Sequence, residues 1–408
     1  MRLARERSSA DLALEQFFER RKHDRAADLR EEAWDSFTRK GLPSRRVESW
    51  HYTDLRAVLR EISPEAAEAG KPAHVTPPAG VVMTSLREAL AQGDVEVMAA
   101  LAPQTGDAAV DLNAALMQDG AVVRIGAGVR LDHPLTLDAS AAEGASSFTR
   151  NLVLVGESAR ATIVETAPPL LARGQENHAL VLQLAAGAEV ELVSDFGPGD
   201  PETVRIYSLL ASIAQGSALK SSAFIWGGGL LRRQIFATLA GERAAASFNG
   251  VAMLGQRAHA DVTLVVRHAA PHGKSRERFR YIVDDEATGV FQGKVSVAQA
   301  AQKTDGAMQS KALLLSPGAT MNSKPELEIF ADDVVCGHGA ACGRLEAEQM
   351  FYLMARGLPR AEAEALLIEG FANEALAEIE TETLREAFGG KVASWLGARR
   401  LQSKGDAR

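Results

Sequence analysis

Cysteine is scarce in this sequence, which has two, Cys336 and Cys342, among 408 residues. Two cysteines cannot build the disulfide framework of a secreted domain, so we expect a reducing compartment, the cytoplasm, and free thiols. Long apolar runs are also lacking. No stretch reaches the roughly 18 apolar residues of a membrane-spanning helix, and the charged amino terminus lacks the apolar core of a signal peptide.

Basic charge is not in excess. Lysine and arginine total 45 against 53 aspartates and glutamates, which gives a net charge of −8. Binding to nucleic acid or to an anionic membrane depends on a basic field that neutralises phosphate groups. The composition therefore disfavours both kinds of partner and leaves protein partners open.

Aromatic residues make up only 5% of the chain, whereas there are 35 glycines. This composition is typical of β structure in which backbones approach closely and turns are frequent. From about residue 120 onwards, apolar residues alternate with polar or small ones, which is the period of a strand. A small-residue turn recurs between these strands, with glycines 25 to 31 residues apart at positions 128, 156, 187, 216 and 241.

Loose repetition at that period predicts a β-solenoid, in which each coil pairs with the next. Inward positions would then form ladders of Val, Leu, Ala and Ile, and the corners would need glycine and other small residues. A β-sandwich remains the alternative, although its turn signals usually fall about every 8 to 12 residues. The fold class that we expect is mainly β.

The segments on either side of the β region have the apolar period of helices. Residues 10–40 predict a helix that Gly41 ends. We therefore divide the chain into an amino-terminal helical domain (1–105), a β-solenoid core (106–340) and a carboxy-terminal helical domain (341–408).

Acidic residues are concentrated near the carboxy terminus. Residues 361–388 predict an amphipathic helix or helix pair, and between 361 and 387 there are eight glutamates and one arginine. Two interpretations remain open: an ordinary solvated helix face, or a docking surface for a basic partner.

The motifs of common enzyme classes are lacking. No glycine fingerprint follows a strand, there is no HExxH, CxxC or GxSxG motif, and no phosphate-binding loop is complete. Nucleotide hydrolysis, if it is involved, would therefore belong to a partner. The pairs Asp284/Asp285 and Asp332/Asp333 could serve glycoside or uronate chemistry, but adjacent residues of a strand point to opposite faces.

One short segment gathers potential metal ligands. CGHGAAC (336–342) holds both cysteines and a histidine, in the spacing Cys-x-His-x3-Cys. Thiolate and imidazole are preferred ligands of zinc, iron and iron–sulfur clusters. Three ligands are one short of a closed tetrahedral site, so another ligand would have to come from elsewhere or from a second chain. The alternative is that Cys336 is a small buried residue and Cys342 part of a turn.

The carboxy-terminal third resembles the SufB/SufD family, the scaffold proteins of the SUF system of iron–sulfur cluster assembly. The central β region resembles the family more loosely, as does the amino-terminal segment LPSRRVESWHYTDL (42–55). The motifs that carry the resemblance follow in the family's order: GVFQGKV (289–295), AQKTD (301–305), LLLSPGA (313–319), KPELEIFADDV (324–334), HGA (338–340) and FYLMARG (351–357).

Within the family, the sequence resembles SufD-type rather than SufB-type chains. SufB-type chains are longer and carry a cysteine before the LLL motif, where this sequence has Ser310. SufD-type chains carry Cys-x-His after the ADDV segment, and Cys336 and His338 stand there. The resemblance implies that His338, with Cys336 close by, helps to ligate or shape a nascent cluster at the interface with a partner. It implies no role for Cys342.

The resemblance implies a right-handed parallel β-helix flanked by helical domains, in a non-catalytic scaffold subunit. The expected partners are a SufB-like subunit and an ABC-type, SufC-like ATPase that docks on the carboxy-terminal helices, with Tyr352, Arg356, Gly357 and Phe371 as candidate docking residues. The expected cofactors are a transient iron–sulfur cluster shared with the partner and, in the complex, reduced flavin. A homodimer in the absence of SufB, a solenoid carbohydrate-active enzyme and a purely structural self-associating solenoid remain alternatives.

Overall fold

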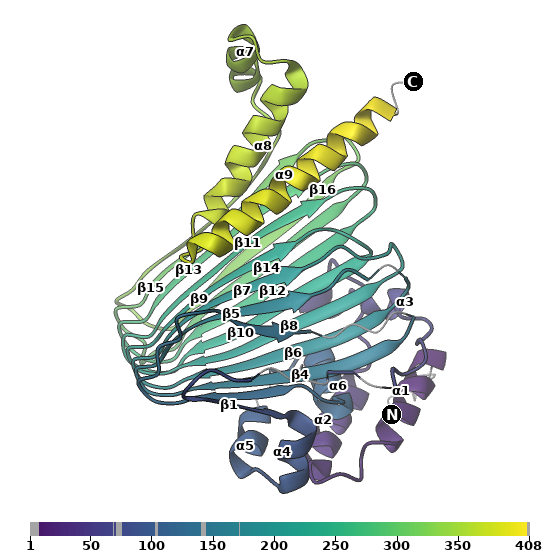
Figure 1. The fold of residues 1–408 in the computed structure, drawn as a ribbon, viewed down its shortest axis with the longest axis vertical. Helices are drawn as coiled ribbons and strands as arrows, with labels where there is room; N and C mark the ends of the chain where they lie inside the picture. Colours follow the sequence, from purple (N-terminus) through teal and green to yellow (C-terminus); the bar gives the residue numbers. More distant parts are fainter. Residues whose placement is uncertain are drawn as a thin grey trace.

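The computed structural model describes residues 8–67, 69–70, 76–102, 105–139, 144–170 and 172–405, with side chains described up to residue 400. Within these residues, the strands form one nine-stranded and one eight-stranded sheet (Figure 1). The nine-stranded sheet consists of β1 (Val81–Ser85), β2 (Ala121–Ile125), β4 (Ser146–Val155), β6 (Gln175–Leu184), β8 (Val204–Ile213), β10 (Leu230–Leu239), β12 (His259–His268), β14 (Thr288–Val297) and β16 (Thr320–Ile329). The eight-stranded sheet consists of β3 (Leu135–Asp138), β5 (Arg160–Ala167), β7 (Glu189–Phe196), β9 (Ala218–Ile225), β11 (Ala245–Leu254), β13 (Lys274–Val283), β15 (Asp305–Leu314) and β17 (Val335–Gly343).

The chain alternates between the two sheets, so that one strand of each sheet makes one coil of a solenoid. Neighbouring strands from β2 onwards are parallel, and the paired residues lie 26 to 32 positions apart, most often 29, as for Gln175 with Val204 and Arg160 with Glu189. Parallel pairing at a constant repeat confirms the solenoid and excludes the sandwich, whose sheets are antiparallel. Among the strands that the structure describes, only β1 pairs antiparallel, with β2.

A left-handed backbone conformation recurs at one corner of successive coils. It is found at Gly128, Ser158, Gly187, Gly216, Arg243, His272 and Lys303. Two of the glycines expected at this turn, Gly156 and Gly241, lie two residues before it. A Cβ atom on Gly241 would lie 2.0 Å from the backbone nitrogen of Gln215, so close contact between coils explains this glycine.

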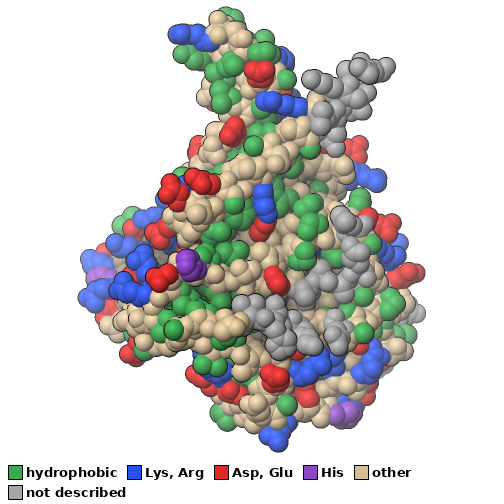
Figure 2. All heavy atoms as spheres, in the orientation of Figure 1, with side chains coloured by type: hydrophobic (Ala, Val, Ile, Leu, Met, Phe, Trp, Pro, Cys, Tyr) green, Lys and Arg blue, Asp and Glu red, His purple; other side chains and the backbone are tan. Residues whose placement is uncertain are grey.

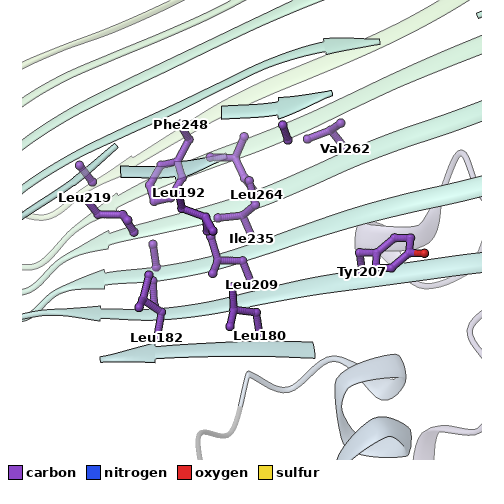
Figure 3. Close-up of a cluster of buried hydrophobic side chains, with 14 of the residues drawn as sticks. Leu180, Leu182, Leu192, Tyr207, Leu209, Leu219, Ile235, Phe248, Val262 and Leu264 are labelled. Carbon is purple, nitrogen blue, oxygen red and sulfur yellow. The ribbon is translucent and has the colours of Figure 1, made fainter. Parts of the chain in front are cut away.

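The interior of the solenoid is packed with aliphatic side chains from both sheets. Figure 3 shows Leu180, Leu182 and Leu209 from β6 and β8 facing Leu192 and Leu219 from β7 and β9. These side chains are essentially inaccessible to solvent. The inward ladders expected from the alternating sequence are therefore present.

The interior also holds charged groups. Glu165 is fully buried, accepts a 2.6 Å hydrogen bond from Ser194, and lies 3.3 Å from Nε2 of His178 and 3.5 Å from a guanidinium nitrogen of Arg233. Burial raises the pKa of Glu165, but the charge of Arg233 and the contact with His178 outweigh this and lower it to about 2.

The amino-terminal helices cover the outer face of the nine-stranded sheet (Figure 1). Phe148 and Ile206 of the sheet share a buried cluster with Phe17 and Leu112 of these helices. The elements are α1 (Ser9–Glu19), α2 (Ala27–Lys40), η1 (Glu48–Trp50), α3 (Leu55–Val58), α4 (Leu86–Gln92), α5 (Val95–Leu101) and α6 (Ala108–Leu116).

The single helix expected over residues 10–40 is wrong, because the chain forms two helices there. Helix α1 begins at a capping box between Ser8 and Asp11, and α2 ends at Gly41 as expected. Between them the chain turns, and Phe18 stacks on Trp34 with ring centroids 4.6 Å apart. This stacking places the two helices side by side, which one continuous helix cannot do.

The segment 42–55 ties these helices to the solenoid. Trp50 is fully buried, donates a hydrogen bond from Nε1 to Asp107 and lies under the guanidinium group of Arg232, 3.8 Å from the ring centroid. Arg232 also donates a 2.6 Å hydrogen bond to the backbone oxygen of Ser49. Trp50 therefore anchors the segment 42–55 by packing, whereas its basic residues Arg45 and Arg46 are exposed.

The carboxy-terminal helices are α7 (Ala347–Ala355), α8 (Arg360–Leu376) and α9 (Glu382–Gly405). Helices α8 and α9 lie on the outer face of the eight-stranded sheet, where Ile368 and Val392 share a buried cluster with Val251. Helix α7 lies beyond the last coils, with no buried residue (Figure 1).

Several of the acidic residues in this region bind the solenoid itself. Glu374 pairs with Arg280 at 2.7 Å, and Glu378 pairs with Arg278 at 2.7 Å. Glu380 pairs with Lys220. Part of the acidic surface that could have received a basic partner is thus used within the chain.

The predicted domain boundaries can be compared with these elements. Helix α6 lies after the boundary predicted at residue 105 and therefore within the predicted core, whereas β1 lies before it, within the predicted amino-terminal domain. Strand β17 continues to Gly343, three residues past the boundary drawn after residue 340. Among the described helices, none is long and apolar enough to cross a membrane.

Candidate functional site

The last coil of the solenoid, formed by β16 and β17, is largely exposed. Strand β17 pairs with β15 only, and β16 pairs with β14 only, so each is the final strand of its sheet among the described residues. We call this coil the open end of the solenoid. Its strands present unpaired backbone groups at their outer edges.

Cys336 and His338 are placed side by side on β17. Cys336 lies opposite Gly306, and His338 lies opposite Met308, which is buried in the interior cluster. Because strand residues alternate between two faces, both side chains belong to the row that faces the interior. The half-buried Cys336 packs against the interior cluster, whereas His338 is exposed.

Cys342 belongs to the same row of β17 but is exposed, four residues beyond His338. At about 3.3 Å per residue, this separates the two by about 13 Å along the strand. The three potential ligands of the CGHGAAC segment therefore do not converge. Among the described residues, no group of three or more histidine, cysteine, aspartate or glutamate side chains could hold a metal ion.

The thiol of Cys336 lies over a small polar region inside the last coils. Cys336 pairs with Gly306 of β15, and Gly306 pairs with Ser275 of β13, one coil further inside. The hydroxyl of Ser275 is 3.0 Å from Nε2 of His268. Burial raises the pKa of the Cys336 thiol. The thiol is therefore protonated at neutral pH until a metal ion or another ligand displaces the proton.

Glu277 adds a carboxyl group to this region. Glu277 lies in the same row as Met308 and His338, one coil deeper than Met308. Its side chain is fully buried. Neither of its carboxylate oxygens has a well-aligned hydrogen-bond partner among the described residues. The pKa of Glu277 is raised to about 7 by burial. The nearby Ser275 hydroxyl and the charge of Arg276 favour the ionised form, but they offset the effect of burial only in part.

Sequence reasoning did not find Glu277, Ser275, His268 or Gly306. Each lies 30 or more residues from Cys336, and only the register of the coils brings them under it. The repeat of about 29 residues was the one signal in the sequence that could have aligned them. Ser310, noted for its place before the LLL motif, is also buried and faces the interior, opposite Ala340.

The candidate docking residues lie in two places. Tyr352, Arg356 and Gly357 are exposed around the end of α7, and the guanidinium group of Arg356 lies 5.3 Å from the centroid of the Tyr352 ring. Phe371 is half-buried on α8, where its ring packs near Arg280. A hollow of about 400 Å³ adjoins α7 and is lined in part by Phe351.

The two aspartate pairs do not form a catalytic carboxylate pair. Arg399 of α9 binds Asp284, and Asp285 accepts a 2.7 Å hydrogen bond from the backbone nitrogen of Gln256. Asp333 pairs with Lys303 at the corner before the open end. These contacts stabilise turns and helix packing.

Comparison with known proteins identifies the family. The model of the SufBD core domain, described as SUF system FeS cluster assembly, matches residues 137–371, and the model of the SufBD amino-terminal region matches residues 13–62 and 66–137. The chain belongs to the SufB/SufD family. The core match covers β4 to β17 together with α7 and most of α8, so it includes the open end and the candidate docking helix.

The relatives are SufD-like. The iron–sulfur cluster assembly protein SufD of Escherichia coli is 29% identical over 398 residues, covering 88% of this chain and 91% of the relative. An iron–sulfur cluster assembly SufBD family protein of Synechocystis is 33% identical over 287 residues, 67% of this chain and 63% of the relative. SufD of Bacillus subtilis is 36% identical over 105 residues, 26% of this chain and 24% of the relative. This SufB/SufD chain is therefore SufD-like, with a role in iron–sulfur cluster assembly.

Proposed function

We propose that this chain is a non-catalytic scaffold subunit that pairs with a SufB-like subunit through its open end. The nascent iron–sulfur cluster is built at that interface, with His338 and Cys336 as the ligands from this chain. A SufC-like ABC-type ATPase docks on the carboxy-terminal helices. The assembly works in the cytoplasm, which the scarcity of cysteine favours.

The observation that carries the proposal is an incomplete ligand set on an uncovered strand. Cys336 and His338 offer one thiol and one imidazole from neighbouring positions of one row. An iron–sulfur cluster is normally held by four protein ligands. A second chain placed over β17 would supply the missing ligands, and the isolated chain would bind iron or cluster poorly.

The composition of the open end supports a protein partner. Val335 is 74% exposed, and Phe330, in the turn between β16 and β17, is 61% exposed. Exposed apolar side chains beside two unpaired strand edges favour association with another chain. A second copy of this chain could cover the same surface, which is the homodimer expected when SufB is absent.

The glycines of β17 also support close approach of another chain. A Cβ atom placed on Gly337, Gly339 or Gly343 would meet no atom within 4 Å. Packing within this chain therefore does not require glycine at these three positions. A partner backbone, or a cluster bound beside His338, would gain the space that their missing side chains leave.

Helix α7 supports the docking of the ATPase. None of its residues is buried, and Phe351 is 75% exposed beside Tyr352 and Met354. An aromatic surface next to Arg356 has the composition of an interface core. Phe371 would contribute indirectly, by fixing α8 on the sheet.

In the mechanism that we propose, ATP-driven movement of the ATPase subunits opens the interface between the two scaffold subunits. ATP binding brings two docked ATPase subunits together, and the pull on α7 and α8 strains the paired scaffolds. Glu374 of α8 pairs with Arg280 of β13, and Glu378, just after α8, pairs with Arg278 of the same strand, so strain on α8 would reach the strand that carries Glu277. The interface then opens, so that sulfur delivered through the SufB-like subunit meets iron near His338.

Reduced flavin, which the resemblance implies for the complex, stays in this proposal as a cofactor of the assembled complex. The residues around Cys336 do not fit a flavin ring, because β16 (TMNSKPELEI) and β17 (VCGHGAACG) contain no phenylalanine, tyrosine or tryptophan on which it could stack. Any contact of this chain with a flavin would therefore lie elsewhere.

The proposal is tested in cells that lack their own copy of this subunit. His338→Ala and Cys336→Ser should fold and assemble, yet fail to restore the activity of iron–sulfur enzymes. Cys342→Ser is the matched control for Cys336, since it lies on the same strand and row. His133→Ala, which removes an exposed histidine near the first coils, is the control for His338.

The results of this experiment distinguish the proposed scaffold role from the two alternatives. Full maturation with His338→Ala would contradict the ligand assignment, and unchanged maturation after deletion of the whole protein would favour a structural solenoid. Turnover of a polyuronate or glycan by the purified chain would favour the carbohydrate-active alternative.

A further inference from the structure

Four exposed arginines gather around α3 in the amino-terminal helical region. Two come from the turn before η1, and two come from α3 and the residues that follow it. The backbone N–H of Arg56 donates a 3.0 Å hydrogen bond to the carbonyl oxygen of Pro43, which brings the two segments side by side. We call this region the arginine surface, and it consists of Arg45, Arg46, Val47, Arg56, Val58 and Arg60.

None of these arginines pairs with a carboxylate among the described residues. The segment 42–61 contains three acidic residues, of which two are engaged. Glu48 pairs with Lys324 at 2.7 Å, and Asp54 accepts a 2.9 Å hydrogen bond from a backbone nitrogen of α3, the helix that it caps. Within the segment, Glu61 is then the one other carboxylate for four guanidinium groups, so the surface carries an excess of positive charge.

Elsewhere on the molecule, many basic side chains are matched by acidic ones. On the face shown in Figure 2, lysines and arginines are interspersed with aspartates and glutamates. Lys220 pairs with Glu380, and Lys303 pairs with Asp333. The arginine surface is therefore a basic region on a chain whose net charge is −8.

Two valines lie among the arginines. Val47 is 44% exposed, and Val58 is 50% exposed. The backbone N–H of Val47 donates a 2.9 Å hydrogen bond to the carbonyl oxygen of Ser44, so the turn is ordered without a partner. Arginine beside apolar side chains is a composition typical of protein interfaces. A surface that is already ordered also loses little entropy when it binds.

The solenoid holds the arginine surface in place. Arg232 of β10 and Gln292 of β14 both donate hydrogen bonds to the backbone oxygen of Ser49, at 2.6 Å and 3.1 Å. The pair of Glu48 with Lys324 attaches the same turn to β16. A partner bound at the arginine surface would therefore be fixed to the solenoid, beside the coil that forms the open end.

The chemistry of this surface favours carboxylates as ligands. All four cations are arginines, and a planar guanidinium group can donate two parallel hydrogen bonds to one carboxylate. Phosphate groups of a membrane or a nucleic acid bind arginine in the same way, but a net charge of −8 repels an extended anionic surface. A short acidic segment of a protein avoids this repulsion, because it covers the basic region alone.

We propose that the arginine surface docks an acidic segment of another protein, with carboxylates on the four arginines and aliphatic side chains against Val47 and Val58. The proposal goes beyond the scaffold role and does not depend on the ligands of β17. It concerns a partner other than the SufB-like subunit, which is expected at the open end, and other than the ATPase, which is expected at α7.

The test uses the purified full-length chain and a short fluorescein-labelled peptide of glutamate, leucine and alanine as the probe. Fluorescence polarisation should show saturable binding that weakens as salt is added, and a peptide with glutamine in place of glutamate should not bind. Arg46→Gln and Arg56→Gln should each weaken binding about two- to fivefold, and the double variant about tenfold. Val58→Ser should weaken it about threefold.

Arg25→Gln is the matched control. Arg25 is an exposed arginine of the same helical region, but it lies beside Gly93 at the end of α4. Its substitution should leave the affinity unchanged. Because all the substituted side chains are exposed, each variant should keep the thermal midpoint of the wild type, so that weaker binding reports the surface and not unfolding.

Several results would overturn the inference. Two of them are no saturable binding of the acidic peptide, and binding that neither arginine substitution weakens. Binding of vesicles of phosphatidylserine and phosphatidylcholine through the same arginines, in place of the peptide, would identify a membrane surface instead. Self-association of the wild-type chain in sedimentation that Arg56→Gln abolishes would identify a second copy of the chain as the occupant.

Val335→Glu separates this inference from the proposed scaffold role. The substitution lies on β17 and should leave the affinity for the peptide unchanged. Loss of peptide binding in this variant would place the peptide at the open end and would also overturn the inference. A failure to pair with the SufB-like subunit leaves the peptide measurement unaffected, and a failure of peptide binding leaves the scaffold role unaffected.

Discussion

Cys336 lies opposite Gly306, and its Sγ is 3.5 Å from the point that a Cβ atom on residue 306 would occupy. The same point is 3.6 Å from Oγ of Ser275. The missing side chain of Gly306 therefore leaves a space between the thiol of the open end and the polar region beneath it.

Gly306→Ala should fill this space without unfolding the protein, because both distances are those of ordinary van der Waals contact. The methyl group covers more of the half-buried thiol. We expect alkylation of Cys336 by iodoacetamide to slow about two- to fivefold. Cys342 is the internal reference, and an unchanged ratio of the two alkylation rates would show that the space does not serve the thiol.

Glu277→Gln should stabilise the protein at alkaline pH and have little effect at acid pH. The pKa of Glu277 is about 7 in the folded chain, against an ordinary value of 4.5. The unfolded chain therefore releases this proton first, and the wild type loses stability as the pH rises from about 4.5 to about 7. The advantage of the variant should reach about 3 kcal/mol above pH 7.

Urea unfolding at pH 5 and pH 8 checks this difference. Glu286→Gln, on the exposed turn after β13, is the matched control and should show no such pH dependence. Equal gains for Glu277→Gln at both pH values would mean that the buried carboxyl group keeps an ordinary pKa.

Arg233→Met should destabilise the chain strongly. It leaves Glu165 buried without its cation, which we expect to cost about 3–5 kcal/mol in the free energy of unfolding at pH 7. The double variant Arg233→Met/Glu165→Gln should recover part of that loss, because the uncompensated charge is gone. Additive losses in urea unfolding would show that the two side chains do not interact.

Val335→Glu should prevent pairing through the open end while the chain still folds. The side chain is 74% exposed, so a charge there costs the isolated chain little, but it would be buried against a partner. Val82→Glu is the matched control, since Val82 is an exposed valine on β1, the strand at the other end of the nine-stranded sheet from β16 of the open end. Sedimentation of the complex should show loss of the SufB-like subunit with Val335→Glu only.

Tyr352→Ala and Arg356→Ala should release the ATPase and leave the thermal midpoint of the chain unchanged, because both side chains are exposed. Co-purification with the ATPase measures the effect. Val95→Ala, an exposed position on α5, is the control. Retention of the ATPase by both variants would place its docking surface away from α7.

The coil architecture could be predicted from the sequence because it depends on local rules. Strand period and small-residue turns repeat at nearly constant spacing, and parallel coils stacked in register convert that spacing into a solenoid. The left-handed backbone conformation at the corners could be predicted only in part. Arg243, His272 and Lys303 adopt a conformation that is expected of glycine. Each donates its backbone N–H to a carbonyl oxygen of the next coil, as Arg243 does to Pro271, and this bond holds the conformation.

The sequence proposes residues for the candidate site, whose roles stay a prediction, but it does not indicate their surroundings. The segment CGHGAAC identified Cys336 and His338, yet nothing local indicated that Cys342 would be about 13 Å from His338 along an extended strand. The alternation of polar and apolar residues predicts that Glu165 and Glu277 lie on strands. It does not predict that their side chains are buried, because an exposed glutamate on a strand gives the same pattern. That information comes only from the coils above and below.

Native mass spectrometry of the tagged chain, purified anaerobically from its own host, tests the central claim most directly. The account predicts a complex of one copy with a SufB-like chain and two copies of an ABC-type ATPase, and loss of the SufB-like chain with Val335→Glu. Recovery of the wild-type chain alone, or only as a homodimer, would contradict the scaffold pairing.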